Sequence, residues 1–128
     1  MPKRLFIISN RLPLTIDNNK DTIIVSPSSG GLVSAITGYL ENNSKSGKRV
    51  FSETYWVGVA GCNTQTWEKA ATLIPDDDYT YLPVFINKKT YEQYYNGFSN
   101  SVIWPLFHYF PSYVEYDKAR FEKYLEAN

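Results

Sequence analysis

The stretch Leu5–Leu32 (LFIISNRLPLTIDNNKDTIIVSPSSGGL) decides the fold of this chain. It opens with four large apolar residues, Leu5–Ile8, a pattern typical of a strand that is covered on both faces. A polar and basic turn follows at once, and it contains Arg11. The stretch closes on Gly30 and Gly31, where a helical pattern begins. A strand, a basic turn and a glycine-rich helix start predict an α/β protein with an anion site at the carboxyl ends of its strands.

Two features of this stretch suit a phosphate group. The guanidinium of Arg11 offers a fixed positive charge and a planar fork of donors. Gly30 and Gly31 lack Cβ atoms where the backbone would approach a ligand, and the helix after them points unpaired N–H groups at the same space. Ordinary interpretations also stand, because Arg11 fits a surface cation and a glycine pair fits a flexible turn. The G-x-G-x-x-G and P-loop spacings are both absent from the sequence.

The length and composition exclude several classes of protein. The 128 residues fit one small domain or a piece of a larger protein. Thirteen basic and thirteen acidic residues balance, which argues against a general nucleic-acid binder. Cys62 is the single cysteine and His108 the single histidine, so the sequence predicts no disulfide and no zinc site, and a reducing, cytoplasmic location. No apolar run approaches 18 residues, so we expect no membrane span, and the amino terminus predicts no signal peptide.

Hydrophobic periodicity predicts the elements along the chain. Strands are expected at 3–10, 53–59 and 79–86, a hairpin at 14–17 and 22–25, and helices at 30–43 (capped by Ser29), 88–95 (capped by Asn87), 99–107 and 117–125 (capped by Asp117), with Gly97 as an interruption. Residues 66–73 fit a short helix or an irregular segment. This order predicts an α/β fold with a largely parallel sheet and a small hairpin excursion.

The first strand would leave an apolar edge on so small a sheet. We therefore expect the chain to be a fragment whose missing part pairs with this strand, or else to associate with another copy as a homo-oligomer.

Aromatic residues are concentrated late in the chain, which holds 11 Tyr, 7 Phe and 3 Trp in all. The densest run is Tyr94–Tyr109 (YYNGFSNSVIWPLFHY). Rings with polar tips suit the faces and hydroxyls of sugars, although a tyrosine-rich core helix would give the same composition.

This run resembles the trehalose-6-phosphate synthase family, whose members carry YYNxF(S/C)NxxLWPxFHY. Two earlier stretches, Ile8–Pro13 (ISNRLP) and Ser29–Leu32 (SGGL), are similar to the first two motifs of that family. Tyr55–Gly61 (YWVGVAG) is similar to its WxGWxG motif, with Trp56 at the first tryptophan. Val59 replaces the second tryptophan, which removes a ring from that position. Four motifs in the family's order cover nearly the whole chain.

The resemblance implies a retaining glycosyltransferase that moves glucose from UDP-glucose to glucose 6-phosphate without a metal or other cofactor. Members of the family have the GT-B fold, two Rossmann-like halves with the site in the cleft between them. Residues 1–128 would form the first part of the N-terminal, acceptor-side domain. The rest of that half and the whole C-terminal half would be missing, so we expect this fragment alone to be inactive and to hold no catalytic residue.

The resemblance also assigns site residues. Arg11 would pair with the acceptor phosphate, and Tyr95 and Trp104 would contact the acceptor. Gly30 and Gly31 would approach the donor. Further candidates for lining the pocket are Trp56, Asn10 and His108.

A retaining glycosidase and a non-catalytic sensor are the alternatives to a synthase. A retaining glycosidase needs two facing carboxylates, and the acidic residues here cluster in expected turns and in the last helix. A non-catalytic sensor or regulatory subunit for sugar phosphates, built on the same fold, stays open.

Overall fold

The computed structural model describes residues 3–19, 22–47, 50–76 and 78–128. The chain divides into two compact units, Met1–Phe85 and Ile86–Asn128, and each is described here by itself. The first unit is α/β and the second is helical.

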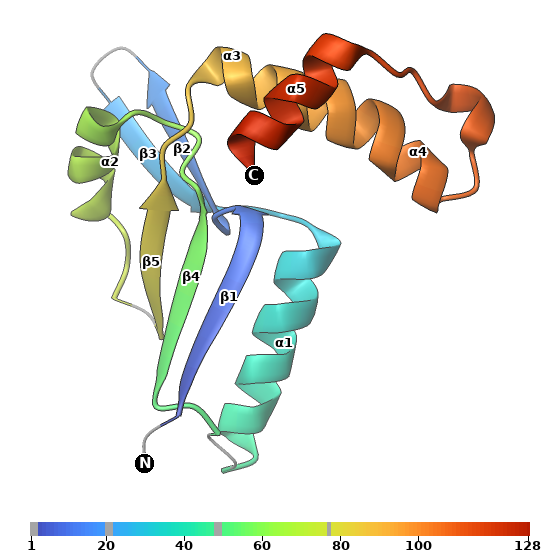
Figure 1. Ribbon diagram of the computed structural model, residues 1–128. Coiled ribbons are helices and arrows are strands. Elements are labelled where there is room, and N and C mark those ends of the chain that lie inside the picture. Colours follow the sequence, from blue (N-terminus) through green and yellow to red (C-terminus); the bar gives the residue numbers. More distant parts are fainter. Residues whose placement is uncertain (1–2, 20–21, 48–49, 77) are drawn as a thin grey trace. The chain divides into compact units, whose positions relative to one another are not determined.

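A three-stranded parallel sheet is the framework of the first unit (Figure 1). Its strands β1 (Arg4–Arg11), β4 (Glu53–Val59) and β5 (Tyr79–Val84) lie in the order β1-β4-β5. The strands β2 (Leu14–Asn19) and β3 (Thr22–Pro27) form a separate antiparallel hairpin. The predicted parallel sheet and hairpin are therefore confirmed.

Two helices complete this unit, α1 (Gly31–Lys45) and α2 (Thr64–Ala71). Residues 66–73 fit either a short helix or an irregular segment, and most of them lie in helix α2. The Asn63 side chain caps the first turn of α2, because it accepts a hydrogen bond from the Thr66 amide. The predicted cap of α1 by Ser29 is wrong. Gly30 is the N-cap and forms no side-chain hydrogen bond, because it has no side chain to offer.

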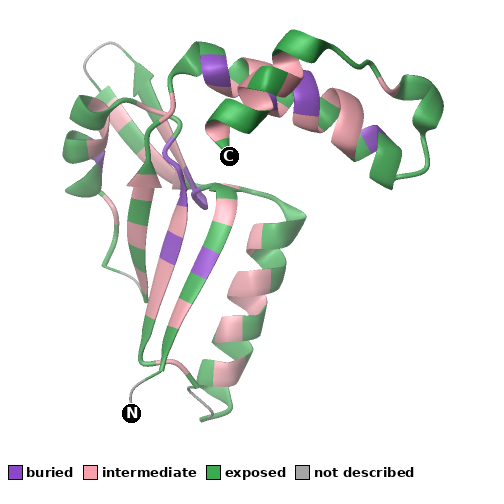
Figure 2. Cartoon of the chain, in the orientation of Figure 1, coloured by how far each residue is buried: buried purple, intermediate pink, exposed green. Residues whose placement is uncertain are grey.

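The core of the first unit lies on one face of the sheet. Ile7 and Trp56 are buried there together with Leu12 and Ala60. Because side chains alternate along a strand, Phe6 and Ile8 belong to the opposite face. Phe6 stacks on Tyr55 with ring centroids 4.9 Å apart. Figure 2 shows buried segments in the middle of β1 and β4, and helix α1 contributes the half-buried residues Val33, Ile36 and Leu40 to the core.

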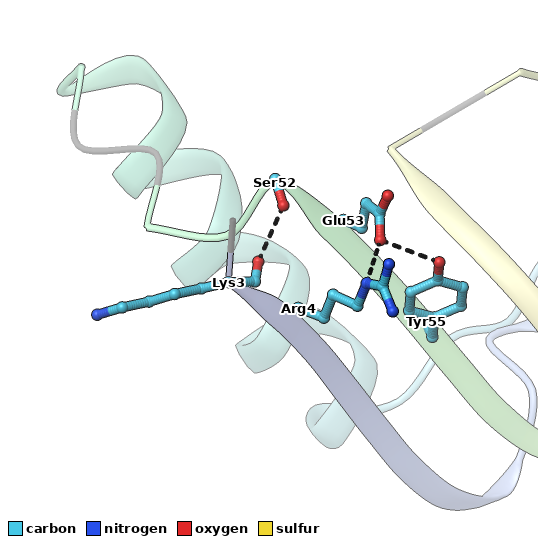
Figure 3. A network of polar contacts seen from close by, with 5 residues as sticks. All are labelled: Lys3, Arg4, Ser52, Glu53 and Tyr55. Carbon is cyan, nitrogen blue, oxygen red and sulfur yellow. Dashed lines mark hydrogen bonds and ion pairs between the residues drawn. The ribbon is translucent and has the colours of Figure 1, made fainter. Parts of the chain in front are cut away.

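The predicted apolar edge is present in the described part of the sheet. β1 pairs with β4 on one side only, so its other side is an open strand edge. On the face opposite the core, Phe6 and Ile8 of this strand are 55% and 80% exposed. The amino ends of β1 and β4 are joined by side chains (Figure 3). Arg4 Nε lies 2.7 Å from Glu53 Oε2, and the Tyr55 hydroxyl donates to the same oxygen at 3.1 Å.

The second unit contains one continuous helical path. It consists of α3 (Lys88–Tyr91), a π-helix (Glu92–Ile103) and α4 (Trp104–Phe107), and a 3₁₀ turn (Pro111–Tyr113) and α5 (Lys118–Ala127) follow it. The prediction that Gly97 interrupts this path is wrong. A Cβ on Gly97 would lie 2.8 Å from Arg120 Cδ, so this glycine permits close packing of α5.

The core of the second unit is aromatic. Phe98 is buried, and its ring centroid lies 5.1 Å from that of Phe121 and 4.9 Å from that of Tyr124. The predicted caps are confirmed, because the Asn87 side chain accepts from the Thr90 amide and the Asp117 side chain accepts from the Arg120 amide. No helix in the described ranges is both long and apolar enough to cross a membrane.

Candidate functional site

Arg11 is the last residue of β1, at the carboxyl edge of the sheet. The pairing with β4 is irregular just before it. Ile8 pairs with Val57 and Arg11 pairs with Val59, so three steps along β1 match two along β4. This is a β-bulge, a feature that bends a strand and redirects its side chains. The side chain of Arg11 is exposed, and no acidic partner for it occurs among the described residues.

Close packing of the backbone holds the bulge in place. A Cβ on Gly58 would lie 2.6 Å from the carbonyl carbon of Arg11 and 2.7 Å from the Leu12 nitrogen. The Leu12 amide donates to the Val59 carbonyl at 3.1 Å and closes the bulge. Asn10 lies inside the bulge and is exposed. The end of β1 can adopt this path because residue 58 has no side chain.

Gly30 and Gly31 lie at the start of α1, as predicted. An added Cβ at either glycine would meet nothing within 4 Å, so the space around them is open. The first helical turn holds no acidic residue that would repel an anion. Unpaired N–H groups and the positive end of the helix dipole face this space. The arrangement suits an anionic group, and the donor-binding role of the two glycines stays a prediction.

Tyr95 and Trp104 belong to the second unit. Tyr95 is half-buried, and its ring centroid lies 5.1 Å from that of Tyr91. Trp104 is 52% exposed and stacks on His108 with centroids 4.1 Å apart and planes 16° apart. The Nδ1 atom of His108 lies 2.7 Å from the Trp104 carbonyl oxygen. His108 therefore supports one face of the indole ring, and much of the ring remains accessible to a ligand.

A row of exposed side chains runs along this helical path at intervals of four residues. Its members are Glu92, Asn96, Asn100, Trp104 and His108. The Asn96 amide donates to Glu92 Oε2 at 2.6 Å, and the Asn100 amide donates to Asn96 Oδ1 at 3.3 Å. Carboxylate and amide groups beside an exposed indole suit a polyhydroxylated ligand. The sequence analysis did not include the two asparagines, although they lie four and eight residues before Trp104, a spacing that places them on the same helix face.

Trp56 is a correction to the predicted site. It is 0% exposed and lies in the hydrophobic core, where its ring meets Tyr79 edge-on. The prediction that Trp56 lines a pocket does not fit this placement, because a fully buried ring presents no surface to a ligand. Its indole Nε1–H instead donates to Ser9 Oγ at 2.8 Å. Ser9 is the residue of this region that the sequence analysis did not single out.

A hollow occurs at the other end of the sheet. Leu40, Lys45, Phe51 and Tyr79 are among the residues that line it, near the end of α1 and the starts of β4 and β5. Arg11 lies at the opposite, carboxyl edge, so this hollow is separate from the predicted anion site.

The predicted acceptor residues are distributed over both units. Arg11 belongs to Met1–Phe85, whereas Tyr95 and Trp104 belong to Ile86–Asn128. Within their own units, Arg11 and Trp104 are exposed and Tyr95 is half-buried. The meeting of these three side chains around one ligand stays a prediction.

Comparison with known proteins places the chain in a family. The model of glycosyltransferase family 20 matches residues 3–128. The alpha,alpha-trehalose-phosphate synthase (UDP-forming) of Schizosaccharomyces pombe is 39% identical over 128 residues, which cover 98% of this chain and 23% of that protein. An enzyme of the same name from Aspergillus fumigatus is 40% identical over 129 residues, again 98% of this chain and 23% of the relative.

A solved structure gives the same result. The Burkholderia xenovorans alpha,alpha-trehalose-phosphate synthase (UDP-forming), crystallised in complex with glucose 6-phosphate, superposes with a TM-score of 0.63 at 25% identity. The match covers 98% of this chain and 23% of that one, so the chain spans about a quarter of the length of these relatives. Because the family model matches nearly the whole chain, this protein belongs to glycosyltransferase family 20.

Proposed function

We propose that the protein to which this chain belongs transfers glucose from UDP-glucose to glucose 6-phosphate, with retention, and so forms trehalose 6-phosphate and UDP. The observation that carries the proposal is the exposed guanidinium of Arg11, held at the carboxyl edge of a parallel sheet without a described acidic partner. Such an arginine suits the phosphate of a sugar phosphate. The relatives support both substrates, because their names include UDP formation and one of them was crystallised with glucose 6-phosphate.

The residues of this chain would supply the acceptor side of the site. In this proposal Arg11 binds the phosphate of glucose 6-phosphate, Tyr95 and Trp104 contact its sugar, and Gly30 and Gly31 approach the donor. Residues 1–128 form the first part of the acceptor-side domain. The groups that stabilise the leaving nucleotide phosphate belong to the rest of the enzyme, so this chain binds without catalysing. We place the whole protein in the cytoplasm, as a possible homo-oligomer that binds neither nucleic acid nor membrane.

Binding and turnover can be measured separately on this chain. We expect calorimetric titration to detect glucose 6-phosphate but not glucose, with no trehalose 6-phosphate formed when UDP-glucose is added. Replacing Arg11 with alanine removes charge-assisted hydrogen bonds, so the affinity should fall about 10- to 100-fold. Arg4→Ala is the matched control, because Arg4 is an exposed arginine at the other end of the same strand.

Three outcomes would count against the proposal or part of it. Equal affinities of the Arg11→Ala variant and the unmodified chain would remove the acceptor role of Arg11. Measurable turnover by this chain would overturn its inactivity. Binding without turnover by a longer protein that contains both halves of the fold would favour the alternative function, a sugar-phosphate sensor or regulatory subunit.

A further inference from the structure

Two hydrogen bonds converge on Ser9, just before Arg11. The indole Nε1–H of Trp56 donates to Ser9 Oγ at 2.8 Å, and Ser9 Oγ donates to the Arg11 carbonyl oxygen at 2.6 Å. A hydroxyl can accept one hydrogen bond and donate another at the same time. Trp56 is fully buried, and breaking this pair would leave its N–H in an apolar core. The core is thereby linked to the backbone of Arg11.

The link matters because of the bulge. Along a regular strand, residues two apart share a face, so Arg11 would lie on the same face as Ile7. That face is the buried one, since Ile7 is 8% exposed and belongs to the core. The extra residue between Ile8 and Arg11 shifts the alternation by one position. The exposed side chain of Arg11 agrees with this shift.

Gly58 provides the room that the bulge needs. The three atoms nearest to an added Cβ all belong to the backbone of Arg11 and Leu12, at 2.6 to 2.9 Å. A backbone cannot rotate away as a flexible side chain can. The bulged path of β1 therefore depends on Ser9 within β1 itself and on Trp56 and Gly58 in the neighbouring strand β4.

We propose that Ser9, Trp56 and Gly58 are positioning residues that keep Arg11 out of the core and ready for an anionic ligand. They act through the backbone of Arg11 and do not contact the ligand themselves. The inference rests on the proposed function, because it takes the phosphate of glucose 6-phosphate as the anion that Arg11 meets. It gives a positioning role to three residues that support the acceptor site without belonging to it.

The test removes the hydroxyl of Ser9. In Ser9→Ala, hydrogen exchange of the Leu12 amide, measured by NMR, should rise about tenfold, because the bulge that this amide closes has lost a hydrogen bond. The affinity for glucose 6-phosphate in calorimetric titration should fall about five- to tenfold. Ser9→Thr keeps a hydroxyl and should recover most of both effects.

Ser52→Ala is the matched control. Ser52 Oγ also donates to a backbone carbonyl of the first strand region, that of Lys3, at 3.2 Å, but at the opposite end of the sheet (Figure 3). We expect this variant to keep both the Leu12 exchange rate and the affinity within about twofold of the unmodified chain.

The outcomes separate this inference from the proposed function. Unchanged exchange of the Leu12 amide in Ser9→Ala would overturn the claim that Ser9 supports the bulge. Faster exchange with unchanged affinity would overturn the claim that Ser9 positions Arg11 for the ligand. Equal losses in Ser9→Ala and Ser52→Ala would indicate general weakening of the sheet and would also overturn it. If the unmodified chain does not bind glucose 6-phosphate, the proposed function of this chain fails. The exchange of the Leu12 amide still decides whether Ser9 supports the bulge.

Discussion

Gly58→Ala is the substitution whose cost the structure determines most directly. The new Cβ would lie 2.6 Å from the Arg11 carbonyl carbon, whereas ordinary contacts begin at 3.4 Å, so the gap must open by about 0.8 Å. The backbone must move to open this gap, and that movement strains the pairing of β1 with β4. Overpacking of this kind costs about 1–3 kcal/mol, and we expect a value near 3 kcal/mol here because no side chain can yield. For a unit of this size, that lowers Tm by roughly 12–24 °C.

Urea unfolding followed by far-UV circular dichroism and tryptophan fluorescence measures this cost. The matched control is Gly38→Ala, in the middle of α1 of the same unit, where an added Cβ meets nothing within 4 Å. Alanine in a helix interior is about 0.5–1 kcal/mol better than glycine, so the control should gain stability. The same chemical change is therefore expected to have opposite signs at the two positions.

A third glycine gives an intermediate case. At Gly97 the nearest atom to an added Cβ is Arg120 Cδ at 2.8 Å, part of a flexible side chain that can move aside. We expect Gly97→Ala to cost less than about 1 kcal/mol. The reasoning is refuted if Gly58→Ala unfolds within about 0.5 kcal/mol of the unmodified chain, or if it costs no more than Gly97→Ala.

The remaining predictions concern caps, charges and the thiol. Asn87→Ala removes the acceptor of the Thr90 amide and should cost about 1 kcal/mol in thermal unfolding of the second unit; an unchanged transition would contradict the cap. The Arg4–Glu53 ion pair is solvent-exposed, so Arg4→Ala should cost less than about 1 kcal/mol, and 0.5 M salt should reduce that cost further. Burial raises the pKa of the Cys62 thiol above its ordinary value of 9.0, so at pH 8 iodoacetamide should alkylate the native chain more slowly than the urea-unfolded chain. The same shift makes stability decline as the pH rises above 9, and equal alkylation rates would contradict it.

Local pattern was sufficient for most elements, and tertiary contacts explain the failures. Asn87 and Asp117 were identified as caps because a cap depends on groups only three residues away. The prediction of a helix break at Gly97 fails because the glycine instead makes room for the side chain of Arg120, a residue of another helix. The i→i+5 hydrogen bonding of Glu92–Ile103 has no established sequence signal, so two separate helices were expected there.

The sequence by itself determined the α/β order of elements and the family, and it indicated Arg11 as the candidate residue for an anion. It could do so because apolar periodicity and short motifs are local properties of the chain. Only the tertiary structure decided that Arg11 is turned away from the core. That outcome needs a bulge whose register comes from β4, a glycine at position 58 and an indole that is 47 residues from Ser9 in the sequence. Such contacts exist only after distant segments have packed together, so no local pattern records them.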